Sequence, residues 1–596
     1  MKQKKRNIYQ HNNLPKWNLN DLYKSKNCKE LKKDLLNLDK DCKLFEKKYF
    51  QKIEKLKAKE LFKAILKIEK IDTKMDKILS YAHLLVAENG NNEKNKIFFQ
   101  QMQEKITSYA SSIIFFGLEL NSISERNLKK LLKSNELKKY KNWIINKRSF
   151  KPHQLDLKIE KLLQDKNITS YNSWVRLFDD TIASLKFSYK NKKLTSSEIF
   201  NLLTDKKETT RKVAAKSVGN TLGKNIKLFS TITNTLAKDK SINDKWRKLS
   251  NPVSSRNLAN VVQDEVVDSL ANSVIEFYPK ISHRYYSLKA EWFGKKYLNY
   301  WDRNAPLPFQ SLKRYSWLEA KEIVLNAYSD FDQEIGKIAK KFFDNSWIHA
   351  PVSEGKSPGA FAASTVAEVH PFILVNYLGK ARDVSTLAHE LGHGIHQCLA
   401  AEQGEILSST PLTLAETASV FGEMLTFNKL LSKCKGKKER KHLLASKVED
   451  MINTVIRQIS FYDFECRLHK ARDKGELTPD EINNIWLSVS HESLGDCFSF
   501  FEGYETFWSY VPHFIHSPFY VYAYAFGDGL VNALYSRFEA KLPGFEEKYL
   551  AMLSSGGSKH HSELLKPFGL DASDPTFWSG GLDVISTLID KLEALE

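Results

Sequence analysis

Apolar residues recur at three- and four-residue steps through most of the chain, the spacing that places them on one face of an α-helix. The pattern is clear in ELKKDLLNLDKDCKLFEKKYFQKIEKLKAKELFKAIL, residues 30–66, and it returns over residues 70–120, 196–240, 261–300 and 317–345. Gly and Pro are sparse before residue 250, which favours long helices. The clearest irregular segments are residues 251–260 and 301–317. We therefore predict a mainly α-helical fold.

Strand signals are rare, and the best of them lies at residues 359–379, GAFAASTVAEVHPFILVNYLG. This segment holds two short apolar runs, of which the second is rich in Ile, Leu, Val and Tyr. It ends just before a histidine-rich stretch. The sequence thus predicts a small β-hairpin or sheet next to that stretch.

Composition is that of an ordinary globular protein, with 42% hydrophobic and 27% charged residues in a chain of 596. No apolar run is long enough for a transmembrane helix, and no apolar segment follows the basic N-terminal residues, so we expect neither a membrane span nor a secretory signal. The six cysteines are scattered and form no CxxC pair, which is typical of reduced thiols. A cytoplasmic protein is the expectation.

The net charge of +20 is concentrated near the N-terminus, because residues 1–150 contain 35 Lys and Arg against 17 Asp and Glu. Such a region could bind nucleic acid or an anionic membrane. However, its lysines alternate with apolar residues at helical spacing, and no nucleic-acid module accompanies them. A solvent-exposed helical surface is the favoured interpretation. We expect neither nucleic acid nor membrane as a partner, and the oligomeric state stays open.

The stretch TLAHELGHGIHQ, residues 386–397, carries the candidate chemistry. On a helix begun by Asp383 or Ser385, His389 and His393 lie one turn apart on one face, so both imidazoles can reach one zinc ion at roughly 2.1 Å. Glu390 points about 100° away from His389 and could act on a water at the metal without binding the metal. This HExxH arrangement is typical of metallopeptidases in which the glutamate is the general base.

His396 lies on the same face, but about 10 Å of helix rise separates it from His389. Three imidazoles spread over that length cannot converge on one ion, so His396 is not expected to be the third ligand. The third ligand should come from another element, because a catalytic zinc commonly takes three protein ligands.

A second helix is predicted to begin at Ser409 or Thr410, with Pro411 in its first turn. Glu416 would fall in the second turn of this helix among small residues, where a buried acid needs a partner such as the metal. Glu423 lies seven residues later on the same face. It is a candidate for an acid that hydrogen-bonds a ligating imidazole.

With these residues the sequence resembles the thimet oligopeptidase-like zinc peptidases, and among them oligoendopeptidase F. The resemblance rests on HELGH at 389–393 and on the glutamate of LAETASVFGE, 23 residues after His393. It extends to WNLNDLY at 17–23, to the segment 370–393, to YVPHFIHSPFYVYAYAFGDGL at 510–530 and to the C-terminal segment 553–582. It therefore covers essentially the whole chain.

The resemblance implies a mainly α, two-lobed metallopeptidase with a deep central cleft. We expect an N-terminal helical region over residues 1–200 and a catalytic domain over residues 201–596. It also implies that His389, His393 and Glu416 bind one Zn²⁺ per chain and that Glu390 is the base. Donors to the oxyanion would come from His513, Tyr520, Tyr522 and Tyr524, of which Tyr520 and Tyr524 share a helix face while Tyr522 is turned away.

The segment HPFILVNYLG, residues 370–379, could offer a strand edge to which an extended peptide adds, with Gly359 and Tyr377 as substrate-binding candidates. The sequence thus predicts a zinc-dependent endopeptidase that hydrolyses short unstructured oligopeptides through a water on the zinc activated by Glu390. An exopeptidase on the same scaffold, such as a dipeptidyl carboxypeptidase, is the first alternative. A non-catalytic protein that binds nucleic acid or membrane is the second.

Overall fold

The computed structural model describes residues 14–167, 169–309 and 313–596; residues 1–13, which hold most of the basic N-terminal segment, lie outside the described residues. The chain folds into two compact units, each built from three separate stretches of sequence. Unit 1 comprises Met1–Ser149, Lys313–Lys433 and Lys541–Gly569, and unit 2 comprises Phe150–Leu312, Cys434–Ala540 and Leu570–Glu596. The division into domains at residue 200 stays a prediction.

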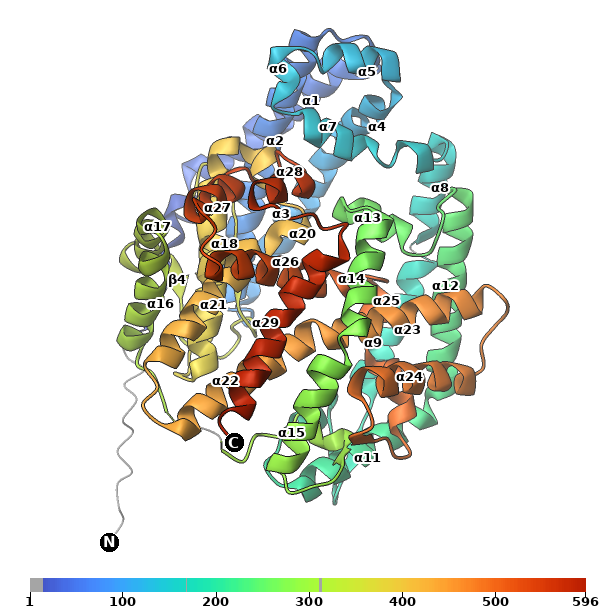
Figure 1. Cartoon of the computed structure of the whole chain (residues 1–596). Helices are drawn as coiled ribbons and strands as arrows, with labels where there is room; N and C mark the ends of the chain where they lie inside the picture. The colour runs from blue at the N-terminus through green and yellow to red at the C-terminus, as the bar shows by residue number, and fades with distance from the viewer. Residues whose placement is uncertain (1–13, 168, 310–312) are drawn as a thin grey trace. The chain divides into compact units, whose positions relative to one another are not determined.

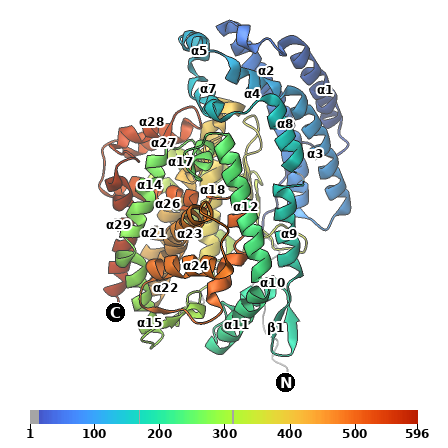
Figure 2. The ribbon, with the colours of Figure 1, turned by 90° about the vertical axis from the view of Figure 1, so that its right-hand side faces the viewer.

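Unit 1 is mostly helical, and Figure 2 shows its helices α1, α2 and α3 running side by side. Its helices are α1 (Lys29–Tyr49), α2 (Ala58–Glu88), α3 (Glu93–Ile113), α4 (Phe115–Ser122), α5 (Glu125–Leu131), α6 (Asn135–Lys138), α7 (Lys141–Arg148), α16 (Trp317–Phe331), α17 (Gln333–Asp344), α18 (Ala381–Ala400), α19 (Glu405–Ser408), α20 (Leu412–Ala415), α21 (Thr417–Ser432), α27 (Phe545–Ser554) and α28 (His561–Leu565).

A three-stranded sheet of unit 1 precedes the histidine-rich helix α18 and packs against it. Its strands are β4 (Ile348–His349), β5 (Phe361–Ala363) and β6 (Phe372–Leu374), in the order β4-β6-β5. Strand β6 pairs in parallel with β4 and antiparallel with β5, with Ala362 opposite Ile373. Phe372 and Leu374 are fully buried and join the apolar core that α1 to α7 form. The small sheet predicted beside the helix is therefore confirmed.

Unit 2 is also mostly helical, and in Figure 1 its last helix, α29, runs against α26. Its helices are α8 (Leu157–Asn167), α9 (Tyr171–Ser184), α10 (Ser196–Leu202), α11 (Glu208–Lys224), α12 (Ile226–Trp246), α13 (Ser254–Asn260), α14 (Asp264–Glu276), α15 (Arg284–Trp292), α22 (Lys437–Thr454), α23 (Ile456–Arg472), α24 (Pro479–Leu494), α25 (His513–His516), α26 (Tyr522–Glu539) and α29 (Pro575–Glu593). Two strand pairs, β1 (Phe187–Tyr189) with β2 (Lys192–Leu194) and β3 (Leu298–Asn299) with β7 (Phe498–Ser499), complete it.

The mainly α-helical fold predicted from periodicity is confirmed, with differences in detail. The apolar pattern over residues 30–66 belongs to two helices, because α1 ends at Tyr49 and α2 begins at Ala58. Residues 254–260, expected to be irregular, form the short helix α13. Among the described helices, none combines the length and the apolar character needed to cross a bilayer.

Candidate metal centre

Helix α18 carries the HELGH motif and crosses α21 at very close range. A Cβ atom at Gly392 would lie 2.4 Å from the carbonyl oxygen of Ala418 and 2.6 Å from the Cα of Ser419, so only glycine permits this approach. The hydroxyl of Tyr328, on α16, donates a hydrogen bond of 2.8 Å to the carbonyl of Ala388. The motif is thus held from two sides by the backbone and side chains of unit 1.

The start of α18 differs from the prediction that Asp383 or Ser385 caps it. The helix begins at Ala381, and the carboxylate of Asp383 accepts hydrogen bonds from the N–H groups of Lys380 and Leu378, at 2.9 and 2.8 Å. Asp383 therefore closes the first turn from within it, as the acid of a capping box does. Ser385 lies about one turn after Ala381, the first residue of the helix.

His389, His393 and Glu416 come together as the sequence predicted. One potential ligand atom from each lies within 4.8 Å of the others, and among the described residues no other such group occurs. Oε2 of Glu416 lies 3.4 Å from Nε2 of His389 and 3.5 Å from Nε2 of His393. Two imidazole nitrogens and one carboxylate oxygen form a donor set that suits zinc and leaves room for a further ligand. The residues present therefore fit a metal ion.

Glu416 reaches the two histidines from a break between helices rather than from the second turn of one helix. Helix α20 ends at Ala415, Glu416 has φ −84° and ψ −1°, and α21 begins at Thr417. The hydroxyl of Ser419 donates to Oε2 of Glu416 at 2.7 Å, which orients the carboxylate. The sequence from Pro411 onward predicted one helix and did not show that α20 is a separate short helix.

Each histidine is also contacted on its other side. Oε2 of Glu423 lies 3.4 Å from Nδ1 of His389, so one carboxylate faces each nitrogen of that ring. The imidazole of His393 forms a hydrogen bond to the backbone carbonyl of Ala415. A partner on the far nitrogen fixes the tautomer that leaves Nε2 free as a ligand.

Glu390 is buried, with 7% of its surface exposed, and its carboxyl group accepts a hydrogen bond from the backbone N–H of Ala362 on β5. Burial raises the pKa of Glu390 to about 7, with His389 opposing this and Glu416 adding to it. A dication beside the carboxylates would act against the rise. Sequence reasoning missed Ala362, since a backbone N–H leaves no signal in residue identity.

His389 and His396, both on α18, have pKa values shifted in opposite directions. Burial alone would lower the pKa of His389, but Glu423 and Glu416 outweigh it and raise that pKa to about 9. His396 is only 5% exposed, and burial lowers its pKa to about 4. His396 also lies outside the three-residue cluster, in agreement with the argument from helix rise.

The substrate edge expected at residues 370–379 is not available. Strand β6 is the central strand of its sheet, with β4 on one side and β5 on the other, so both of its edges are already paired. The hydroxyl of Tyr377 is buried and donates to the carbonyl of Tyr315 at 2.9 Å, and the carbonyl of Gly359 accepts a hydrogen bond from Asn376 at 2.9 Å. Tyr377 therefore serves packing, and the edge strands of the sheet are β4 and β5.

In unit 2, three of the four candidate donors gather in one cluster. Nε2 of His513 lies 3.4 Å from the hydroxyl of Tyr524, and the rings of Tyr520 and Tyr524 lie 5.4 Å apart. Tyr522 is the exception: it is fully buried, and its hydroxyl accepts a hydrogen bond of 2.8 Å from Asn260. Tyr522 is therefore a core residue, and we remove it from the catalytic candidates.

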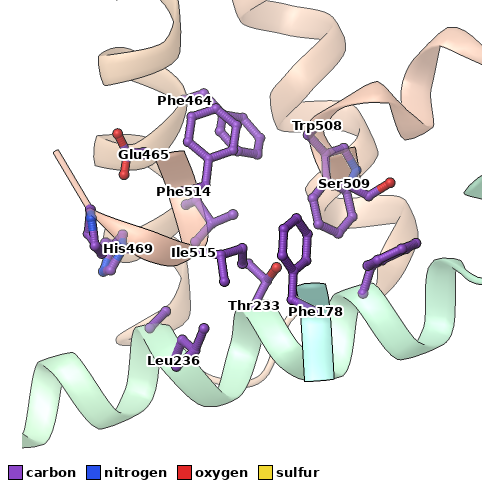
Figure 3. Close-up of a pocket in the computed structure, with 14 residues that line it drawn as sticks. Phe178, Thr233, Leu236, Phe464, Glu465, His469, Trp508, Ser509, Phe514 and Ile515 are labelled. Carbon is purple, nitrogen blue, oxygen red and sulfur yellow. The ribbon is translucent and has the colours of Figure 1, made fainter. Parts of the chain in front are cut away.

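A cavity of about 20 Å³ lies between α9, α12, α23 and the segment that leads to α26. Figure 3 shows Glu465 and His469 on one side of the cavity, with Phe514 beside them and Trp508 and Ser509 opposite. Oε1 of Glu465 accepts a hydrogen bond of 2.8 Å from the backbone N–H of Phe519. The residue before Tyr520 is thus tied to α23, a contact that sequence reasoning missed because the two residues are 54 positions apart.

Comparison with known proteins gives two family matches. Residues 201–583 match the model of peptidase family M3, and residues 119–187 match that of oligopeptidase F. Among curated proteins, oligopeptidase PepF of Bacillus subtilis is 27% identical over 90% of this chain and 81% of its own length. An oligoendopeptidase F homolog of Borreliella burgdorferi is 26% identical, over 92% of this chain and 94% of its own.

Solved structures show the same fold. A peptidase from Chlamydophila abortus matches with a TM-score of 0.87 at 22% identity, covering 98% of both chains. Oligoendopeptidase F from Enterococcus faecium matches with a TM-score of 0.71 at 21% identity, covering 95% of this chain and 98% of its own. These likenesses extend over both units of the chain.

A helical fold that holds an HExxH helix against a second helix preceded by a ligand glutamate defines a class of metal-dependent peptidases. The chain belongs to peptidase family M3 and is a metalloendopeptidase of the oligoendopeptidase F type.

Proposed function

We propose that this protein is a zinc-dependent endopeptidase that hydrolyses short unstructured peptides, with Glu390 as the general base. One observation carries the proposal: His389, His393 and Glu416 present three ligand atoms within 4.8 Å of one another, beside the buried carboxyl group of Glu390. When bound, the ion supplies a Lewis acid and acidifies water. Two imidazoles and one carboxylate suit zinc well, although cobalt or manganese accepts the same donors.

Glu390 is placed to move protons because it follows His389 directly but points about 100° around the helix from it. It can therefore reach a water at the metal without being a ligand. The N–H of Ala362 holds one side of its carboxyl group, which leaves the other side to accept a proton from the attacking water. Glu390 then delivers that proton to the leaving amine. A base restrained by a backbone donor keeps its position through both transfers.

Glu423 and the carbonyl of Ala415 act through the ligands. Oε2 of Glu423 faces Nδ1 of His389, and the carbonyl of Ala415 accepts a hydrogen bond from the imidazole of His393. Each partner keeps a proton on one ring nitrogen and leaves the other as a ligand. Partners of this kind usually change metal affinity by about 10- to 100-fold. We assign Glu423 to this role and Glu416 to direct ligation.

The substrate backbone is proposed to add to the outer edge of β5. In an antiparallel pair, the N–H and C=O of one residue point to the same side, and those of its neighbours point to the other. Because the N–H of Ala362 donates to Glu390, the Ala362 backbone faces away from β6 and toward the base. Main-chain hydrogen bonds there would hold a peptide without reading its side chains.

His513, Tyr520 and Tyr524 are proposed as hydrogen-bond donors to the oxyanion. Their mutual contacts keep two hydroxyls and one imidazole in one cluster. A positioned donor of this kind contributes roughly 3 kcal/mol to transition-state stabilisation. Substrates are proposed to be oligopeptides and the compartment the cytoplasm.

The proposal is tested by metal analysis combined with hydrolysis of a peptide of about ten residues whose two ends are blocked. We expect about one zinc per chain, internal cleavage of the blocked peptide, loss of activity on chelation and recovery with zinc. The matched variant is Glu390→Gln, which should keep its metal while activity falls by about three orders of magnitude, because base and charge stabilisation are lost together.

Two results would overturn these assignments. Cleavage only of peptides with a free C-terminus would replace the endopeptidase by an exopeptidase. Loss of zinc from Glu390→Gln, with the fold intact by circular dichroism, would make Glu390 a ligand rather than the base.

A further inference from the structure

Two arginines of unit 2 line one small cavity, and among the residues that the structure describes neither forms an ion pair with a carboxylate. The cavity has a volume of about 20 Å³ and lies among α15, α23, α24 and the 3₁₀ turn Tyr504–Tyr510, elements that Figure 1 draws in green and orange. Arg303, at the end of the turn Tyr300–Asp302, and Arg457, in the first turn of α23, both contribute to its wall. Trp486 and Tyr504 line it as well.

The donors on this wall lack acceptors. Nε of Arg303, Nε of Arg457 and Nε1 of Trp486 are buried and have no hydrogen-bond partner within the described part of the chain. Trp486 is only 4% exposed. Arg303 does donate from Nη2 to Asn453 at 2.9 Å, and it forms a hydrogen bond with the hydroxyl of Tyr286, but neither neutral group brings a charge. Buried N–H groups are nearly always paired, so three orphans on one cavity indicate an occupant that accepts hydrogen bonds.

The charge of the two arginines is not balanced by the protein. The side chains that act most strongly on Arg303 are Tyr286, Tyr504 and Tyr510. The same three tyrosines and Arg303 act most strongly on Arg457, and no carboxylate is among these groups. Burial and the neighbouring Arg303 lower the pKa of Arg457.

Carboxylates in the vicinity are already paired. Glu449 lies 2.5 Å from the ammonium group of Lys289. Asp302 lies 2.6 Å from the guanidinium group of Arg211 and 2.7 Å from the ammonium group of Lys295. Each of these acids therefore has a cation of its own. Two like charges on one partly buried wall are unfavourable unless a counter-charge joins them.

We propose that this cavity binds one small monovalent anion of the size of chloride between Arg303 and Arg457. A volume of about 20 Å³ holds one or two water-sized occupants and is too small for a phosphate or a peptide carboxylate. A water molecule could accept the orphan hydrogen bonds, but it would leave both charges uncompensated. The first turn of α23 contains no acidic residue, so the positive end of that helix adds to the attraction.

The direct test uses the unmodified full chain, crystallised in sodium bromide with chloride left out. We expect one anomalous bromide peak in the cavity lined by Arg303, Arg457 and Trp486. Density without an anomalous signal, at a bromide concentration that labels other surface sites, would show that water fills the cavity and would overturn the proposal. This measurement does not depend on whether any variant folds.

A second test compares Arg457→Gln with Arg467→Gln while chloride replaces methanesulfonate at constant ionic strength. Arg467 lies on the same helix but has carboxylate partners in Asp463 and Glu492, at 2.7 and 2.6 Å, so it is the matched control. We expect a saturable rise in Tm with chloride for the unmodified chain and for Arg467→Gln, because a ligand of the folded state stabilises it. Arg457→Gln should lose the rise.

The difference in Tm between Arg457→Gln and the unmodified chain at low chloride provides a further check. Without an anion, Arg457→Gln removes one of two repelling charges, so its Tm should equal or exceed that of the unmodified chain. With chloride, the order should reverse. A chloride-dependent rise of the same size and midpoint in Arg457→Gln would contradict the proposal.

Discussion

The backbone N–H of Phe519 donates a hydrogen bond to Oε1 of Glu465, with 2.8 Å between the nitrogen and the oxygen. Phe519 is fully buried and has φ 59°, in the left-handed region that residues with a Cβ rarely adopt. A residue held there costs of the order of 1–3 kcal/mol, so its surroundings must fix it. Tyr520, a proposed oxyanion donor, follows Phe519 directly. Glu465 therefore helps to fix the position of the backbone from which Tyr520 projects.

Replacing Glu465 separates its role as an acceptor from its role as a charge. Glu465→Leu leaves the N–H of Phe519 buried without a partner, which should cost about 1–3 kcal/mol of unfolding free energy. Released from this contact, Tyr520 should shift, and kcat should fall more than KM changes. Glu465→Gln keeps an amide oxygen as the acceptor and should retain most of both properties. Urea unfolding and steady-state peptide hydrolysis measure these effects; a Leu variant with unchanged kcat would remove Glu465 from positioning.

The same carboxyl group predicts a pH dependence of stability. Burial raises the pKa of Glu465 to about 8, with the N–H of Phe519, Arg256 and Lys240 opposing the rise. The folded state then holds the proton more firmly than the unfolded state, whose carboxyl titrates near 4.5. The contribution of Glu465 to stability is therefore complete below about pH 4.5 and is lost as the pH rises to about 8.

This dependence is isolated by comparing the unmodified chain with Glu465→Gln, which cannot titrate at this position. We expect the unfolding free energy of the unmodified chain to fall relative to that of the variant between pH 5 and pH 8. A constant difference across this range would mean that the carboxyl group titrates at its ordinary pKa.

The crossing of α18 and α21 predicts that Gly392→Ala is destabilising. Its Cβ would lie 2.4 Å from the carbonyl oxygen of Ala418, so the helices must separate, at a typical overpacking cost of roughly 1–3 kcal/mol. The separation would also move Glu416 from the histidines and weaken metal binding. Gly117→Ala is the control: no atom lies within 4 Å of a Cβ there, and in the helix α4 it should stabilise by up to about 1 kcal/mol. Equal unfolding free energies for the two variants would contradict the packing argument.

The sequence predicted the helical fold and the metal cluster because both follow local rules. Helical periodicity placed His389 and His393 on one face, and an acid among apolar residues singled out Glu416. The break of the helix at Glu416 was not predictable, because the hydrogen bond from Ser419 that stabilises the turned carboxylate is a tertiary detail. The pattern placed Tyr520 and Tyr524 on one helix face; their rings do lie 5.4 Å apart, but α26 begins at Tyr522, so Tyr520 precedes the helix.

What the sequence could not show depends on pairings between distant segments. The prediction of a free strand edge at residues 370–379 was wrong, because β4 pairs with one edge of β6 and β5 with the other. The contact of Glu465 with Phe519 spans 54 residues, and the wall shared by Arg303 and Arg457 joins segments even further apart. Single residues of these types on a helix are ordinarily solvated, so only the fold distinguishes them.

The ligand that comes from outside the HExxH helix gives the most discriminating prediction for the metal centre. Glu416→Ala removes one of three donor atoms and leaves two imidazoles facing a dication, so affinity should fall by more than the 10- to 100-fold, roughly, of an outer partner. Glu423→Ala removes only the partner of Nδ1 of His389, 3.4 Å away, and should fall within that range. His396→Ala should keep the metal, because His396 lies outside the cluster.

The three variants are compared in one chelator titration, with circular dichroism to check their folding. The order of metal affinity expected is His396→Ala above Glu423→Ala above Glu416→Ala. If His396→Ala lost the metal while Glu416→Ala kept it, a site built from HExxH and the glutamate between α20 and α21 would have to be abandoned.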